Sequence, residues 1–310
     1  MSSTYEPFTL KLAWNLAAPP TWPAAIMPAL IAIALSATAQ GGIDVLLACV
    51  LVVICILMQS AANMINDYLD FKKGTDSLDD NLEADDAVLL HHHIDSKKVL
   101  YTGVSLLVVA FLLGIYPIVC AGFVPLLIAF VGAAVVVLYS CGKTPISYLP
   151  IGELVIGVVM GGLMPLACCY VLTRTMLPVF VVGVIPCVIS VGLILLTNNT
   201  CDIEKDRVAH RKTLSVVIGR PSARTLYHGL LALWFAIVLL VVAVWYEGAL
   251  FLLPFMVLAA LPTVMALLKD PLEPASRIGA MSKICTLNVI VGAFYIAAIF
   301  AGRTTLFGLL

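Results

Sequence analysis

Long apolar stretches alternate with short polar segments along the whole chain. Nine stretches of roughly 17–25 mainly apolar residues, the length that crosses a bilayer as a helix, lie near residues 19–38, 44–66, 98–116, 120–139, 151–171, 177–199, 226–246, 249–268 and 285–302. We expect helices, because an isolated strand would leave backbone groups unpaired in hydrocarbon. Residues 126–138 also lack the alternation of a membrane-barrel strand. The pattern predicts an all-α polytopic bundle of about nine transmembrane helices.

The composition agrees with lipid as the main solvent of this chain. Of 310 residues, 62% are hydrophobic and 11% are charged, whereas a soluble domain has about 25% charged residues. We therefore expect residues 1–310 to form a single transmembrane domain in the cell membrane. The lipid bilayer is its expected surrounding, and no nucleic-acid partner is expected.

The basic residues predict the orientation of the spans. Fifteen of the seventeen Lys and Arg fall within or beside segments 1–18, 67–97, 140–150, 200–225 and 269–284. Only Arg174 and Arg303 fall on the other side. The excess of basic residues in cytoplasmic loops predicts a cytoplasmic N-terminus, cytoplasmic loops at about 67–97 and 200–225, and a C-terminus outside.

Two clusters of acidic and amide residues interrupt the apolar pattern where the second and sixth spans end. They consist of Asn63, Asn66, Asp67 and Asp70, and of Asn198, Asn199, Asp202 and Asp206. Spacings of three and four residues would place these side chains on one face of a continued helix. Such oxygen donors suit Mg²⁺ with a diphosphate. A single cluster could be ordinary interfacial caps, but two at equivalent depth favour one shared metal site, because intramembrane acids are costly without a function.

Basic residues accompany both clusters. Lys143 follows the fourth span, and Arg211 and Lys212 follow the second cluster. Lys and Arg can bind the diphosphate oxygens that a metal leaves free, Arg through its planar fork. Their position also agrees with the general excess of basic residues on the inner side of a membrane.

The two clusters and the segment between them resemble those of the UbiA-type intramembrane prenyltransferases. The first motif is Asn63-x-x-Asn66-Asp67-Tyr68-x-Asp70-x-x-x-Gly74-x-Asp76, and the second is Asn198-Asn199-x-x-Asp202-x-x-x-Asp206-Arg207, followed by Arg211-x-Thr213-Leu214 and Gly219. Between them lies Tyr139-x-x-Gly142-Lys143-x-Pro145-x-x-Tyr148-x-x-x-Gly152-Glu153. This segment is more similar to the naphthoate branch of the family than to the 4-hydroxybenzoate branch. Three departures are the absence of the family's Arg from residues 85–93, His210 where a Gly is common, and Glu153 in place of the usual Asp.

The resemblance implies a Mg²⁺-dependent transfer from a polyprenyl diphosphate to 1,4-dihydroxy-2-naphthoate, with decarboxylation to demethylmenaquinol. It implies that Asp67, Asp70, Asp202 and Asp206 are catalytic and hold the metal with Asn63, Asn66, Asn198 and Asn199. It further implies that Lys143, Arg211 and Lys212 bind the diphosphate and that Tyr139, Tyr148 and Glu153 position the aromatic acceptor.

Other functions stay open at this point. The acceptor could be another aromatic ring such as 4-hydroxybenzoate. A polytopic transporter could use the same acids to bind ions, although here the acids lie at span ends rather than near the midplane. A phosphatidyltransferase would need an Asp-rich DGxxAR motif, which the sequence lacks.

Overall fold

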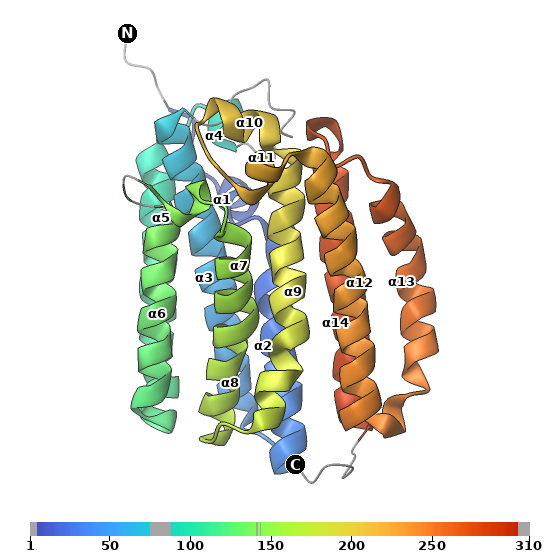
Figure 1. Ribbon diagram of the computed structural model, residues 1–310. Coiled ribbons are helices and arrows are strands. Elements are labelled where there is room, and N and C mark those ends of the chain that lie inside the picture. The colour runs from blue at the N-terminus through green and yellow to red at the C-terminus, as the bar shows by residue number, and fades with distance from the viewer. Residues whose placement is uncertain (1–4, 75–87, 141, 143, 303–310) are drawn as a thin grey trace.

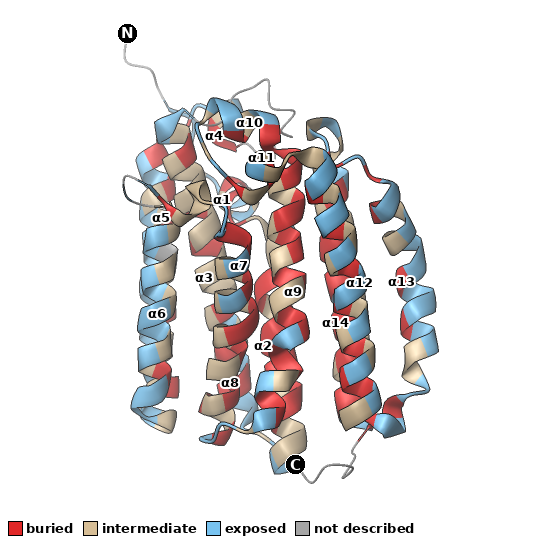
Figure 2. Ribbon diagram, in the orientation of Figure 1, coloured by how far each residue is buried: buried red, intermediate tan, exposed pale blue. Residues whose placement is uncertain are grey.

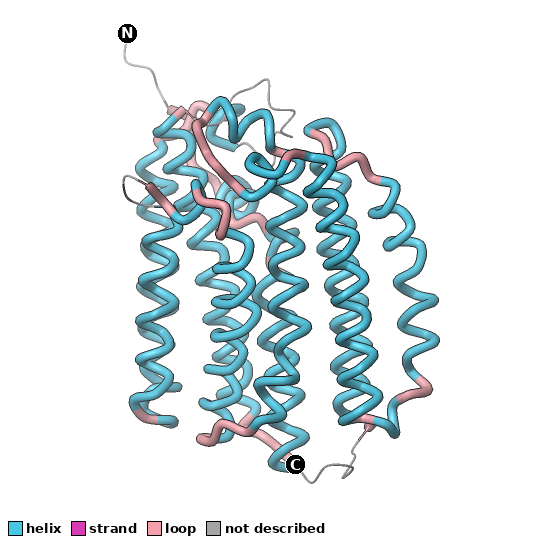
Figure 3. The backbone as a smooth tube through the Cα atoms, in the orientation of Figure 1, coloured by secondary structure: helices cyan, strands magenta, loops and turns pink. Residues whose placement is uncertain are grey.

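The computed structural model describes residues 5–74, 88–140, 142 and 144–302, and they form an upright bundle of helices (Figure 1). Among the described residues, nine helical segments are long and apolar enough to cross a membrane. They are α2 (Pro23–Gln40), α3 (Val45–Lys73), α5 (Ser96–Ala121), α6 (Phe123–Ser140), the segment from α7 to α8 (Gly152–Thr173), α9 (Pro178–Cys201), α12 (Arg220–Trp245), α13 (Leu252–Lys269) and α14 (Arg277–Ala301). Strands do not occur in the described part of the chain (Figure 3). The predicted all-α bundle and its span count are confirmed.

The apolar surface of the bundle is divided between a central core and an outer ring. In α2 and α9, 56% and 61% of the most apolar window is buried, whereas in α6 and α13 only 6% and 17% is buried (Figure 2). Large side chains such as Phe111 and Leu258 are exposed on the outer helices. A contiguous exposed apolar surface of this kind needs lipid rather than water around it. Helices α2 and α9 therefore form the centre against which the site is built.

Short helices gather at one end of the bundle. These are α1 (Leu10–Leu16), α4 (Val88–His91), α10 (Ile203–Val208) and α11 (Leu214–Ile218) (Figure 1). Helices α3 and α9 both end there, and α14 begins there. Because both acidic clusters lie at the ends of α3 and α9, they occupy this same end.

The first cluster lies on a continued helix, as the spacing of its acids and amides predicts, so residues 67–73, which were predicted to begin a loop, are helical instead. Helix α3 continues to Lys73 and ends at Gly74, whose φ of 67° is a left-handed conformation that glycine adopts easily. The N–H of Gly74 donates to the carbonyl of Asp70. Asn66 and Asp70 are therefore one helical turn apart on a continuous helix.

The second cluster spans a break between two helices. Helix α9 ends at Cys201, and Asp202 has φ −94° and ψ 15°. Helical hydrogen bonding nevertheless continues, because Asp202 N–H donates to Asn198 O at 3.0 Å and Asp206 N–H donates to Asp202 O at 2.8 Å. The four-residue spacing thus keeps these three residues on one face through the break.

Two glycines bring the fifth span against α9. Gly157 and Gly161 lie in a π-helical turn between α7 (Gly152–Ile156) and α8 (Met164–Thr173). A β-carbon on Gly161 would lie 2.3 Å from the Cys187 carbonyl oxygen. Small residues four apart permit such close backbone approach between membrane helices. This contact holds Glu153, one turn before Gly157, beside the end of α9.

Candidate active site

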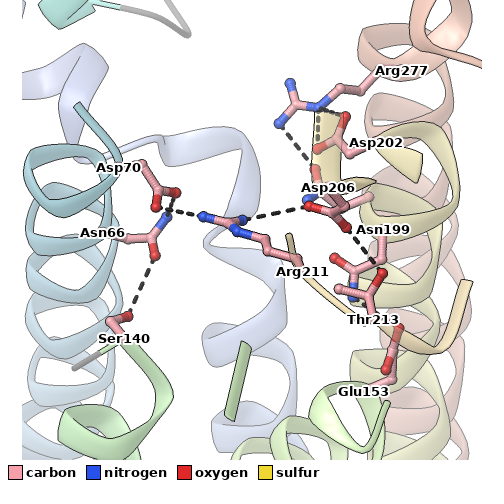
Figure 4. Close-up of polar contacts among 11 residues, drawn as sticks. Asn66, Asp70, Ser140, Glu153, Asn199, Asp202, Asp206, Arg211, Thr213 and Arg277 are labelled. Carbon is pink, nitrogen blue, oxygen red and sulfur yellow. Dashed lines mark hydrogen bonds and ion pairs between the residues drawn. The ribbon is translucent and has the colours of Figure 1, made fainter. Parts of the chain in front are cut away.

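One guanidinium joins the two acidic clusters. Arg211, in the segment between α10 and α11, donates from Nη2 to Asp70 Oδ1 at 2.5 Å, and its Nη1 lies 3.7 Å from Asp206 Oδ1 (Figure 4). The side chains of Asp70 and Asp206 are 9% and 3% exposed. The structure therefore brings α3 and α10, which are distant in sequence, to one buried ionic site.

The position of Arg211 is fixed from several directions. Its backbone N–H donates to Asp206 O at 2.8 Å, and its guanidinium carbon lies 5.1 Å from the centre of the Tyr148 ring. The N–H of Lys212 donates to Tyr148 O at 2.9 Å. Burial opposes the charge of Arg211, but Asp70 and Asp206 together raise its pKa. The guanidinium therefore stays protonated and oriented.

Asp206 is the most buried acid of the second cluster. Its Oδ2 accepts a hydrogen bond from Thr213 Oγ1 at 3.0 Å. Burial raises the pKa of Asp206 to about 6, Arg211 opposes this rise, and the neighbouring Asp202 adds to it. A raised carboxylate pKa means that additional positive charge here would be favourable. The electrostatics suit a bound cation.

The first cluster is arranged around Asp70. Asn66 Nδ2 donates to Asp70 Oδ2 at 3.1 Å, and Ser140 Oγ at the end of α6 donates to Asn66 Oδ1 at 3.4 Å. Asp67 is half-buried on the same helix. Asn63 lies deeper, where its Nδ2 donates to the carbonyl of Ala17 at 2.9 Å. The structure thus places Asn66 with Asp70 and places Asn63 against the chain that precedes α2.

A second arginine holds the other cluster. Arg277, the first residue of α14, lies with Nε 3.1 Å from Asp202 Oδ1, and its Nη2 donates to Asn198 Oδ1 at 3.0 Å (Figure 4). The sequence indicates no role for Arg277 beyond membrane orientation. No local motif marks it, because its partners come from a helix far away in the sequence.

Glu153 is a buried acid on the fifth span, only 7% exposed. Its Oε1 accepts a hydrogen bond from Asn199 Nδ2 at 2.8 Å (Figure 4), while Oε2 is buried without a hydrogen-bond partner among the described residues. The Tyr139 ring lies beside Gly152, with Cε2 4.0 Å from the place of a β-carbon there. Asn199 and Tyr139 therefore lie near Glu153, whereas Tyr148 lies against Arg211.

Two further residues were predicted to bind diphosphate. The side chain of Lys212 is exposed on the segment that carries Arg211. Lys143 lies outside the described residues.

The donor set of the site consists of hard oxygen atoms. They come from Asp70, Asp202, Asp206, Asn66 and Asn198. Carboxylate and amide oxygens fit Mg²⁺, which takes one or two carboxylates and completes its octahedron with water and phosphate oxygens. Among the described residues, no group of three His, Cys, Asp or Glu side chains is arranged to hold a metal ion.

The fold and the paired clusters together define a multi-pass membrane protein whose two acidic clusters share one end of the bundle. The model of the UbiA prenyltransferase family matches residues 25–287, and the chain belongs to this family. It is therefore a UbiA-type membrane prenyltransferase, and the transporter alternative is set aside.

Related proteins agree with this assignment. The chain is 32% identical over 286 residues to the 1,4-dihydroxy-2-naphthoate octaprenyltransferase of Bacillus subtilis (strain 168), covering 91% of this chain and 90% of the relative. It is 30% identical over 297 residues to UbiA prenyltransferase domain-containing protein 1 of Homo sapiens, covering 91% and 81%.

Solved structures share the fold at low sequence identity. A UbiA homolog from Archaeoglobus fulgidus bound to GPP and Mg²⁺ superposes with a TM-score of 0.66 at 14% identity, covering 94% of this chain and 98% of that chain. A digeranylgeranylglyceryl phosphate synthase superposes with a TM-score of 0.58 at 18% identity, covering 94% and 98%. These likenesses establish the helical architecture.

Proposed function

We propose that this protein transfers a polyprenyl group from a polyprenyl diphosphate to 1,4-dihydroxy-2-naphthoate, with loss of CO₂, in a Mg²⁺-dependent reaction. The observation that carries the proposal is the contact of Arg211 with both Asp70 and Asp206, which unites the two acidic motifs. The Bacillus subtilis relative supports the naphthoate as acceptor. The segment from Tyr139 to Glu153 supports the same branch of the family.

Oxygen atoms of both clusters would hold the metal. The residues are Asp70, Asp202, Asp206, Asn66 and Asn198, with Asp67, Asn63 and Asn199 as further predicted ligands. When bound, Mg²⁺ neutralises diphosphate charge and makes diphosphate a better leaving group. UbiA homologs bound to Mg²⁺ with GPP or DMAPP support a metal requirement in this family.

Arg211 would bind diphosphate oxygens while the allylic carbon–oxygen bond breaks. Its planar fork can donate two parallel hydrogen bonds to phosphate, and Tyr148 and Asp206 already hold it in place. A donor that is oriented before the reaction stabilises developing negative charge without reorganisation. Lys143 and Lys212 are the additional predicted contacts.

The remaining steps need an environment without water. The allylic cation left after ionisation must be shielded from hydrolysis. The apolar side chains of the bundle would provide that shielding. The acceptor ring then forms a carbon–carbon bond through its carboxyl-bearing carbon. Breaking the bond to the carboxylate releases CO₂ and returns an electron pair that restores the aromatic ring, so no oxidant is needed.

Glu153 would orient the acceptor through its unpartnered Oε2. Because a hydrogen bond to a charged group contributes about 1.5–3 kcal/mol, Glu153→Gln is expected to raise the KM for the naphthoate roughly tenfold or more. The KM for the prenyl diphosphate should stay unchanged in the same steady-state assay. Glu247→Gln is the matched control, because this exposed acid lies just after α12, whose last turn lies at the end of the bundle away from the acidic clusters (Figure 1). An equal rise in both KM values would contradict the assignment.

We also infer that the site faces the cytoplasm. Fifteen of the seventeen Lys and Arg fall within or beside the segments predicted to lie on the side of the motifs, and cytoplasmic loops are enriched in Lys and Arg. The N-terminus would then be cytoplasmic, and the C-terminus would lie outside.

A direct assay tests the proposed acceptor. Purified protein in lipid nanodiscs is given Mg²⁺, a polyprenyl diphosphate and either 1,4-dihydroxy-2-naphthoate or 4-hydroxybenzoate. We expect a prenylated product from the naphthoate, with one CO₂ released per transfer. Transfer to 4-hydroxybenzoate alone would replace the acceptor, and absence of transfer to either ring would overturn the proposal.

A further inference from the structure

The second acidic motif contacts Arg277, an arginine that lies outside the motif in the sequence. Arg277 contacts Asp202 through Nε and Asn198 through Nη2. The side chains of Arg277 and Asp202 are only 17% and 12% exposed. Both partners are proposed metal ligands, so this arginine lies inside the site rather than at its edge.

The start of α14 is held rigidly, which fixes where Arg277 can reach. Ser276 Oγ donates to Asp270 Oδ1 at 2.7 Å, and Lys283 Nζ donates to Asp270 Oδ2 at 2.8 Å. Glu273 and Ser276 also form a reciprocal capping box. A guanidinium attached to such a fixed backbone loses little freedom when it binds an anion.

Arg220 lies at the same end of the bundle as Arg277 but has different contacts. It binds both carboxylate oxygens of Glu204, at 2.8 Å and 2.6 Å, and donates to the Leu272 carbonyl at 2.9 Å. Glu204 is 53% exposed and belongs to neither set of proposed metal ligands. Arg220 therefore ties the start of α12 to α9, to α10 and to the segment before α14, whereas Arg277 is the one of the two that contacts proposed metal ligands.

The chemistry of Arg277 gives it two possible anionic partners. The planar fork of a guanidinium can donate two hydrogen bonds either to a carboxylate or to two oxygen atoms of a phosphate group. A divalent cation held by Asp202 competes with Arg277 for the same carboxylate. A diphosphate that accompanies the cation offers the guanidinium new oxygen atoms.

We infer that Arg277 is a diphosphate-binding and positioning residue of the site. Without metal it holds Asp202 and Asn198 in place, and with Mg²⁺ present it exchanges this pairing for the substrate diphosphate. The inference rests on the proposed function and adds a residue from the last helix to its binding machinery. It predicts opposite effects of Arg277 on the two ligands, which a purely structural arginine would not produce.

The experiment compares Arg277→Gln and Arg277→Lys with Arg220→Gln as control. Calorimetric titration with Mg²⁺ alone should show Arg277→Gln binding Mg²⁺ roughly three- to tenfold more tightly, because a competing cation is gone. With Mg²⁺ saturating, the affinity of Arg277→Gln for an unreactive farnesyl thiodiphosphate should fall roughly tenfold or more. Both affinities of Arg277→Lys should lie between those of Arg277→Gln and the unsubstituted protein. Arg220→Gln should change neither affinity.

Other outcomes overturn the inference in distinguishable ways. A parallel loss of both affinities with a lower melting temperature would make Arg277 a scaffold residue. Unchanged affinities in Arg277→Gln would remove it from the site while leaving the proposed function intact. If the unsubstituted protein binds neither Mg²⁺ nor the thiodiphosphate, the proposed function itself fails, and this inference fails with it.

Discussion

Asp70→Asn and Asp206→Asn should each lower kcat/KM for the prenyl diphosphate by more than about a hundredfold. Asparagine keeps the size of the side chain but removes the charge that attracts the metal and orients Arg211. Charge stabilisation by a bound metal contributes several kcal/mol to such a transition state, and each 1.36 kcal/mol corresponds to a factor of ten. Steady-state rates with a labelled prenyl diphosphate, taken over a range of Mg²⁺ concentrations, measure the effect.

Glu204→Gln is the matched control for these two variants. Glu204 lies between Asp202 and Asp206 in sequence, yet its side chain is 53% exposed and pairs with Arg220. The activity of the Glu204→Gln variant should stay within about twofold of that of the unsubstituted protein, since exposed ion pairs contribute little to stability. Normal activity and normal Mg²⁺ dependence in either Asp variant would falsify the shared site.

The number of spans could be predicted from sequence because bilayer thickness fixes their length. The ends of the helices could not. The apolar pattern of the second span stops near residue 66, whereas α3 continues to Lys73. Hydrogen bonds stabilise Asn66 and Asp70 in the helical conformation. They join Asn66 to Asp70, Asn66 to Ser140 of α6, and Asp70 to Arg211. A hydropathy pattern contains no information on such tertiary contacts.

The residues of the site could also be predicted from the sequence only in part. The spacing of acids and amides indicated both clusters, because helical periodicity is local. The partners of Asn199 and Asp202 were not indicated. Asn199 meets Glu153 only because Gly157 and Gly161 let the fifth span approach α9, and Asp202 meets Arg277 only because α14 begins beside it. Such pairs depend on how distant helices pack.

The dual contact of Arg211 makes a graded series of substitutions informative. Arg211→Lys keeps the charge but replaces a planar fork with a single ammonium, which cannot reach Asp70 and Asp206 in the same way. We expect it to lower kcat/KM for the prenyl diphosphate roughly tenfold. Arg211→Gln removes the charge and should lower kcat/KM at least about a hundredfold, the range seen when one preorganised donor is lost.

Loss of folding must be separated from loss of diphosphate binding in this series. Removing Arg211 leaves Asp70 and Asp206 buried without a compensating charge, which costs roughly 3–5 kcal/mol. Added Mg²⁺ can supply that charge, so it should restore the melting temperature of Arg211→Gln. It should not restore the KM for the prenyl diphosphate, because the diphosphate still lacks its guanidinium. Arg207→Gln, at an exposed position on α10, should leave both quantities unchanged. Full recovery of the KM at high Mg²⁺ would mean that Arg211 only neutralises the two acids and does not bind substrate.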